Sequence, residues 1–173
     1  MHLDLPLEQL VKRRGAAFQL AFASEAKALM PSREEFALSA SHKGLHVLAR
    51  NEESLAPPLE VLRDAYGPAL LVEPPRVRLL GGPRPKEPIM HVRVSLYANS
   101  RDAVRKALQA RGAVLSEDYL GATYCVLRCE APLADLLGFP AELSRLTAGT
   151  AKHWIVLSHY ALVTGGPGGG MAA

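Results

Sequence analysis

The sequence contains little cysteine and no long apolar run. Its 173 residues include two cysteines, Cys125 and Cys129, too few for the four ligands of a structural zinc site. On a strand these positions share a face about 13 Å apart, beyond disulfide reach, so we expect two small buried hydrophobic side chains. No segment approaches the roughly 20 apolar residues of a membrane span, and the first residues show no signal peptide. These absences predict a cytoplasmic protein without a membrane partner.

Motifs for catalysis are also absent. The sequence has no Gly-x-x-x-x-Gly-Lys-Ser/Thr segment to cradle nucleotide phosphates, and the Gly-rich stretch 165–170 has no lysine after it. No serine lies in a Gly-x-Ser-x-Gly context, and the six histidines lack metal-ligand spacing. The adjacent acids Glu52 and Glu53 are typical of a solvated turn. We expect no catalytic residue, no metal and no cofactor.

Neither sign of charge is in large excess. Lys and Arg number 20 against 17 Asp and Glu, which gives a net charge of +3. This balance permits contact with nucleic acid without requiring it, so any such contact needs a local patch. Apolar residues make up 49% of the chain, enough for a packed core.

The first half of the chain gives mixed structural signals. Apolar spacing and turn residues predict, in order, a helix over 6–14, a strand over 16–23, a short helix within 24–35, a hairpin over 36–49, a helix over 55–66 and a strand over 69–72. Pro31 interrupts the expected helix within 24–35. The hairpin turns at Lys43-Gly44, and Gly67-Pro68 ends the later helix.

The segment Gly81–Lys86 reads Gly-Gly-Pro-Arg-Pro-Lys and predicts a linker. Beyond it, the patterns predict a strand over 90–97, a helix ending at Gly112, a hairpin over 114–129, a helical face over 132–146 and a strand over 152–160. This βαββαβ order places two helices on one face of an antiparallel sheet and leaves the other face open or docked. We expect domains at 1–80 and 87–163, the linker at 81–86, and a disordered tail at 164–173.

Several segments of the second half resemble one family. Glu87-Pro88-Ile89-Met90 before the strand, Ala110-Arg111-Gly112 after the helix, and the run 143–149 are similar to the fifth domain of elongation factor G. Residues 55–77 resemble, more weakly, the last helix and strand of its third domain. The resemblance implies an α+β fold of two ferredoxin-like (βαββαβ) sandwiches with antiparallel sheets. The first sandwich is open to being incomplete, because the resemblance fades upstream of Glu35.

The resemblance also implies a function. The G domain is missing, and the linker stands where elongation factor G inserts its fourth domain, an arrangement similar to the BipA family. The chain would be a stand-alone, non-catalytic module associated with the ribosome or rRNA, which competes with a full-length factor or works beside a separately encoded GTPase domain. Two alternatives stay open: a dimerisation or small-molecule regulatory module that pairs with a second copy, and a retained fragment without activity.

Two surfaces are candidates for partner binding. Strand parity places on the open sheet face the residues Arg93, Tyr124, Arg128, Lys152 and Trp154, together with Tyr97 and Val156. Aromatic rings among cationic groups can stack on bases or dock another protein surface, and we favour docking within the chain or on another subunit. The second candidate is the outward helix face of Arg101, Arg105 and Lys106, whose simpler interpretation is a solvated face.

Overall fold

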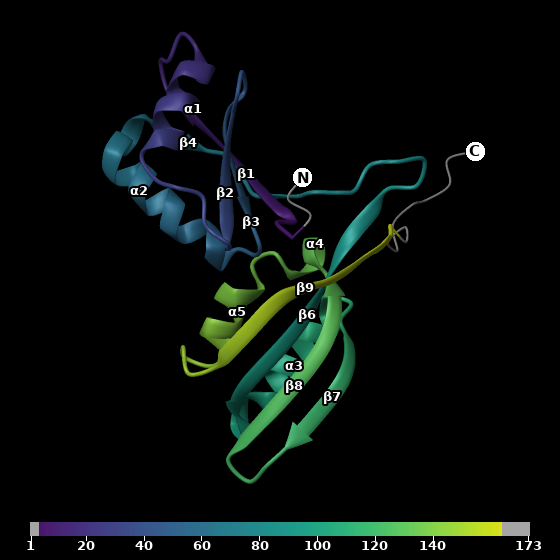
Figure 1. Cartoon of the computed structure of the whole chain (residues 1–173). Coiled ribbons are helices and arrows are strands. Elements are labelled where there is room, and N and C mark those ends of the chain that lie inside the picture. Colours follow the sequence, from purple (N-terminus) through teal and green to yellow (C-terminus); the bar gives the residue numbers. More distant parts are fainter. Residues whose placement is uncertain (1–3, 164–173) are drawn as a thin grey trace, which may run out of the picture.

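The computed structural model describes residues 4–163, so the expected tail at 164–173 lies outside the described residues. It contains two antiparallel sheets, each with helices on one face (Figure 1). The expected α+β class is therefore confirmed.

The first sheet has every element of the βαββαβ order. Its elements are β1 (Leu7–Arg13), α1 (Gln19–Ala28), β2 (Phe36–Ser41), β3 (Gly44–Ala49), α2 (Ala56–Tyr66) and β4 (Leu70–Val72). The strand order is β2-β3-β1-β4, and a two-residue strand, β5 (Arg76–Val77), also pairs with β1. Single-turn helices η1 (Glu53–Leu55) and η2 (Gly67–Ala69) flank α2. The rings of Phe22 and Tyr66 meet edge to face, which joins α1 to α2 over one side of the sheet.

The expected helix over 6–14 is wrong, because these residues form strand β1. Leu7, Leu10 and Val11 have helical spacing, but the buried side of the strand is Leu7, Gln9 and Val11. A polar residue in the middle of the buried row hid the strand alternation. Gln9 is held there by donating from Nε2 to the carbonyl of Glu73 at 2.7 Å.

The expected strand over 16–23 is also wrong, because helix α1 begins within it. Phe18 and Leu20 alternate with Phe22, yet Phe18 is 77% exposed and only Phe22 is buried. The other buried residues of α1 are Ala23 and Ala26. Because alanine is only weakly apolar, the buried side of the helix does not stand out from the exposed side in the sequence. Pro31 lies beyond the end of this helix and does not interrupt it.

The hairpin over 36–49 and the helix at 55–66 are confirmed. Gly44 has a φ of 138°, and a Cβ there would lie 2.4 Å from the carbonyl oxygen of Val11, so only glycine fits where the hairpin passes β1. Gly67 ends α2 with a positive φ of 51°, as the Gly-Pro pair predicts.

The second sheet follows the expected order. Its elements are β6 (Lys86–Tyr97), η3 (Ala98–Ser100), α3 (Arg101–Ala110), β7 (Val114–Leu120), β8 (Tyr124–Pro132), α4 (Leu133–Leu136), α5 (Phe139–Leu146) and β9 (Lys152–Leu162). The strand order is β7-β8-β6-β9. The helical face expected over 132–146 is two helices, because Leu137 is extended and Gly138 adopts the left-handed conformation with φ 79°.

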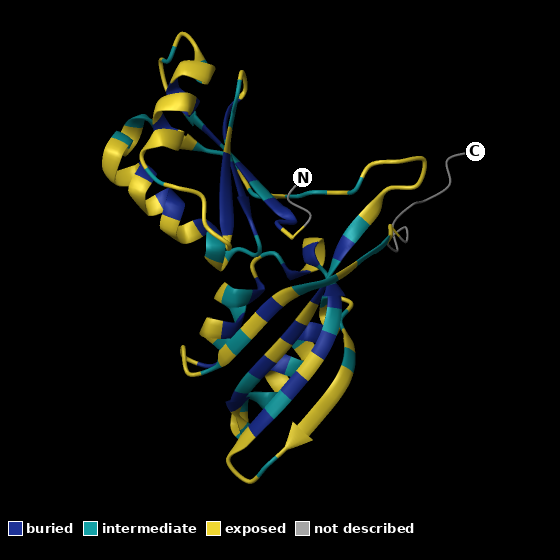
Figure 2. Ribbon diagram, in the orientation of Figure 1, coloured by how far each residue is buried: buried dark blue, intermediate teal, exposed yellow. Residues whose placement is uncertain are grey.

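The helices of the second half lie over the same side of its sheet. Helix α3 contacts α5, and α4 contacts β6 and β8, as the view of the second sheet also shows (Figure 1). Val92 and Leu127 are buried beneath them, and so are Cys125 and Cys129, as expected. Buried and exposed residues alternate along β6 and β8 (Figure 2), so the opposite side of the sheet faces outward.

The chain between the sheets doubles back on itself. Leu80 and Lys86 exchange backbone hydrogen bonds of 2.9 and 3.1 Å around the turn, and Lys86 is the first residue of β6. The segment 81–86, which we expected to be a linker, is thus closed by backbone hydrogen bonds between Leu80 and Lys86, and its last residue belongs to strand β6.

Candidate partner-binding surface

The open face of the second sheet brings five of the predicted residues together. Arg93 on the central strand β6 lies directly opposite Arg128 on β8 and Trp154 on β9. Two residues further along β6, Ser95 lies opposite Lys152, and at the end of the strand Tyr97 pairs with Tyr124. Strand parity therefore identified the members of this surface correctly, although their binding role stays a prediction.

The charged groups of this face are only partly compensated. Arg128 lies 3.2 Å from a carboxylate oxygen of Glu117 on β7, and both side chains are about half exposed, so solvent screens the pair. Arg93 lies over the ring of Trp154 with its guanidinium carbon 5.3 Å from the ring centroid. Among residues 4–163, Arg93 has no carboxylate within ion-pair distance. Two arginines facing each other across strands repel unless an anion joins them.

Aromatic rings remain exposed on the same face. Trp154 is 51% exposed, and Tyr97 and Tyr124 stack with ring centroids 4.6 Å apart. Val156, next to Trp154 on this face, is 49% exposed. The first half of the chain does not cover this face, which excludes docking within the chain, whereas docking on another subunit stays a prediction.

A shallow hollow crosses the four strands at this place. The side chains around it come from every strand of the sheet: His91, Val92, Arg93, Ser116, Arg128, Cys129, Trp154 and Val156. Arg93 and Trp154 line the hollow and remain exposed, whereas Val92 and Cys129, which belong to the core, are buried. The hollow thus combines guanidinium donors with an aromatic ring.

The second predicted surface is not a continuous cationic patch. Arg101 donates from Nε and Nη2 to the Asp118 carboxylate at 2.8 and 2.5 Å, so its charge is already paired. Arg105 is half-buried, and its Nε has no hydrogen-bond partner in the described chain. Lys106 alone of the three is exposed. The helical periodicity placed these residues on one face but could not show the carboxylate that β7 brings to Arg101.

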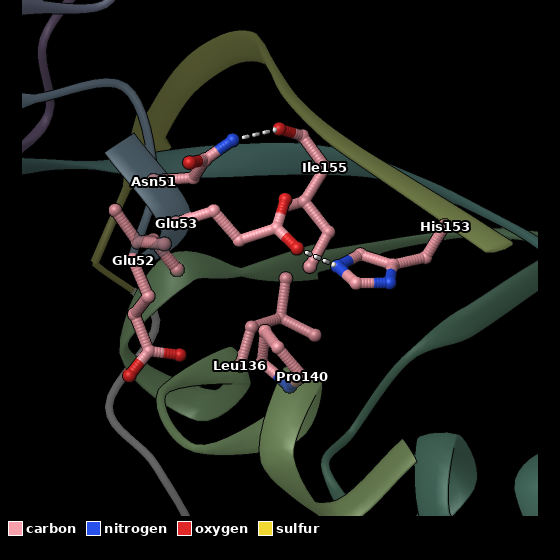
Figure 3. A pocket seen from close by; sticks show the side chains of 8 residues that line it. Asn51, Glu52, Glu53, Leu136, Pro140, His153 and Ile155 are labelled. Atoms are coloured by element: carbon pink, nitrogen blue, oxygen red, sulfur yellow. Dashed lines mark hydrogen bonds and ion pairs between the residues drawn. The ribbon is translucent and has the colours of Figure 1, made fainter. Parts of the chain in front are cut away.

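One turn of the first half contacts the second half, which the sequence did not predict. Asn51 donates from Nδ2 to the Ile155 carbonyl at 2.9 Å, and a carboxylate oxygen of Glu52 accepts from the Gly138 amide at 2.8 Å. Figure 3 shows Asn51 and Glu53 reaching toward β9. The turn was expected to be solvated, and that expectation is wrong for these contacts.

The third contact of this turn joins Glu53 to His153. Their Oε1 and Nε2 atoms lie 2.9 Å apart, within ion-pair range but without hydrogen-bond alignment (Figure 3). The space enclosed beside them is about 10 Å³, the size of one water molecule at most. We therefore interpret this place as a joint between the halves and not as a ligand site.

A Ser-His-Glu chain of contacts lies on the first sheet. Ser41 Oγ is 2.7 Å from Nε2 of His46, whose Nδ1 contacts the carboxylate of Glu8. The Lys43 amide donates to the same Ser41 oxygen. Ser41 lies at the end of β2, His46 on β3 and Glu8 on β1, so these contacts join the hairpin to β1. Within 4–163, no cluster of three or more potential metal ligands is found.

No helix in the described part of the chain is long and apolar enough to span a membrane. The helices instead cover two antiparallel sheets of identical strand order, which defines the class as paired ferredoxin-like domains. Residues 85–168, which contain the second of these domains, match the family model described as elongation factor G C-terminus. The match is to that C-terminal domain and not to a nucleotide-hydrolysing domain.

Two further comparisons agree with this assignment. Elongation factor G 2 of Hahella chejuensis is 36% identical over 80 residues, which are 46% of this chain and 12% of that protein. A crystal structure of a protein from Thermus thermophilus aligns with a TM-score of 0.65 over 92% of this chain and 41% of that chain. It is 15% identical, so it shows the fold alone. The chain is thus related to a translation factor over a small part of that factor's length.

Proposed function

We propose that this chain is a non-catalytic, cytoplasmic module that associates with the ribosome or its RNA in translation. The observation that carries the proposal is the match of residues 85–168 to the elongation factor G C-terminus family. In the proposed arrangement, residues 1–80 and 87–163 form two domains, and residues 81–86 link them. In this proposal the chain does not hydrolyse GTP.

The uncovered sheet face supports an RNA-containing partner. Arg93, Arg128 and Lys152 lie on that face with two carboxylates, Glu117 paired with Arg128 and Glu130 paired with His91. Contacts between cationic groups and phosphates weaken steeply as the salt concentration rises, because the release of counterions then contributes less free energy. We therefore expect ribosome association that falls between low and physiological ionic strength. A separately encoded GTPase domain would bind elsewhere on the chain.

Co-sedimentation with ribosomes tests the proposal. The chain is mixed with purified ribosomes and pelleted through sucrose at about 50 mM and about 200 mM salt, a range over which phosphate-dependent binding falls by orders of magnitude. We expect the chain in the ribosomal pellet at low salt and a smaller fraction at high salt. A chain that stays in the supernatant at both concentrations contradicts ribosome association.

Light scattering on the free chain tests the alternative module. A stable dimer that does not pellet with ribosomes would favour pairing of two copies through the open face, since Trp154 and Val156 are exposed apolar residues there. A monomer that pellets with ribosomes supports the proposed function.

A further inference from the structure

We propose that the hollow around Arg93, Arg128 and Trp154 is a site for one unpaired nucleotide of RNA. Its phosphate would lie between the two guanidinium groups, and its base would stack on the exposed aromatic ring or on the guanidinium plane of Arg93. The inference rests on the proposed function and names the chemistry of its contact surface.

The register of the sheet places the two arginines that would hold the phosphate side by side. Arg93 and Arg128 are direct cross-strand partners, which places their Cβ atoms about 4.5–5.5 Å apart. Like charges at this separation disfavour each other, and a phosphate that accepts from both relieves the repulsion through charge-assisted hydrogen bonds. The exposed pair with Glu117 is easily exchanged for a phosphate, because solvent already screens it. Ser116 and His91 line the same hollow, and His91 lies 3.2 Å from a carboxylate oxygen of its cross-strand partner Glu130.

The register also places the stacking surface next to the phosphate position. Trp154 is the partner of Arg93 on the other side, and their cation–π contact holds the guanidinium beside the ring. Single-stranded RNA is bound by surfaces of this kind, where bases stack on aromatic rings and arginine planes while cationic groups hold the backbone. A duplex keeps its bases stacked inside the helix and cannot use the ring.

A second copy of the chain fits this face less well. In a two-fold dimer the same patch meets itself, so Arg93 and Arg128 of one copy would approach those of the other. Like-charge juxtaposition disfavours such an interface. An acidic protein segment would satisfy the arginines but would not need an exposed aromatic plane. The charges together with the ring favour an unpaired nucleotide.

The single tryptophan of the chain makes the site directly observable. Trp154 is the only tryptophan in the sequence, so its fluorescence reports on this face alone. The probes are a single-stranded RNA of about eight nucleotides, within the range that single-strand-binding surfaces cover, and a closed RNA duplex of the same length. We expect the single strand to quench the fluorescence of Trp154 saturably and the duplex to leave it nearly unchanged.

Variants separate the two parts of the site. Each phosphate neutralised on a single strand contributes about 0.7 to the slope of log K against log salt. Because both arginines hold the same phosphate, Arg93→Gln/Arg128→Gln should lower that slope by about 0.7. Trp154→Leu should weaken binding about 5- to 150-fold, whereas Trp154→Phe should keep most of it, as measured with fluorescently labelled RNA. The matched control is Arg63→Gln/Arg145→Gln, which removes the same charge from exposed positions on α2 and α5.

Several results would overturn the inference. These are equal quenching by the duplex, an unchanged salt slope in the double arginine variant, or quenching that follows dimer formation instead of RNA. If these variants keep full ribosome co-sedimentation, the site is wrong while the proposed function stands. If the single strand binds as expected but the chain does not pellet with ribosomes, the site stands and the proposed function fails.

Discussion

At the residue scale, Cys129 shows how burial in the second sheet changes the ionisation of a side chain. Burial raises the pKa of this thiol from 9.0 to about 11, and the neighbouring charge of Glu130 acts in the same direction. The unfolded chain ionises the thiol at its ordinary value, so the native state is favoured fully below about pH 9 and loses this contribution as pH rises toward 11.

We therefore predict that the free energy of unfolding decreases between pH 9 and 11, and that Cys129→Ala makes this decrease shallower. Urea denaturation of both proteins across this window measures the difference. The smaller side chain lowers stability at every pH, so the comparison uses the slope with pH and not the absolute value. Parallel curves for the two proteins would show that the thiol does not titrate as described.

Single residues also mark the limit of what sequence can predict. Alternation along the strands placed Arg93 and Trp154 on the same face, because period-two patterns fix the face of a strand, and the register of the structure makes them neighbours. It could not show that Arg101 is paired with Asp118, since that contact depends on how β7 lies against α3. Surface membership follows from local pattern, whereas the availability of a charge depends on tertiary contacts.

At the element scale, the turn Asn51–Glu53 joins the two halves. Asn51 accepts from the amide and hydroxyl of Ser54 at 3.0 and 2.9 Å, which fixes its side chain at the start of η1, and it also donates to the edge of β9. One short turn thus supplies contacts to two separate places, Gly138 before α5 and the strand β9.

We predict that Asn51→Ala/Glu52→Ala/Glu53→Ala uncouples the halves, because alanine removes each donor or acceptor. At about 0.5–1.5 kcal/mol for each of the three contacts, the triple variant should lose about 1.5–4.5 kcal/mol of coupling and separate one thermal unfolding transition into two. Scanning calorimetry measures this. The control Glu60→Gln/Asp64→Asn removes two exposed acids from α2 and should keep the wild-type transition. An unchanged single transition in the triple variant would show that apolar packing alone couples the halves.

Helices and strands could be predicted from the sequence where the apolar residues that show the periodicity are also the residues that are buried. Strands β6 and β8 of the second half have regular buried rows, such as Val92 and Val94 on β6, and their predictions are confirmed. The prediction of β1 is wrong because Gln9 interrupts its buried row, and that of α1 because alanines form its buried stripe. In both cases tertiary packing overrides the local pattern.

At the scale of the whole molecule, the two sheets share one strand order but differ in what they offer a partner. On the first sheet, Glu8, His46 and Ser41 contact one another, and Leu48 packs with Leu5 and Ala37. On the second sheet, Arg93, Arg128 and Trp154 remain exposed instead. The second sheet therefore provides the binding surface in our account.

Photo-crosslinking from this surface tests the central claim most directly. Replacing Val156, which lines the hollow and is 49% exposed, by azidophenylalanine keeps Arg93, Arg128 and Trp154 in place. The matched control places the same group at Val61, which is 41% exposed on α2. After irradiation with ribosomes, we predict covalent attachment to ribosomal RNA from position 156 and little from position 61. Attachment to a second copy of the chain, or equal attachment from both positions, would contradict the account.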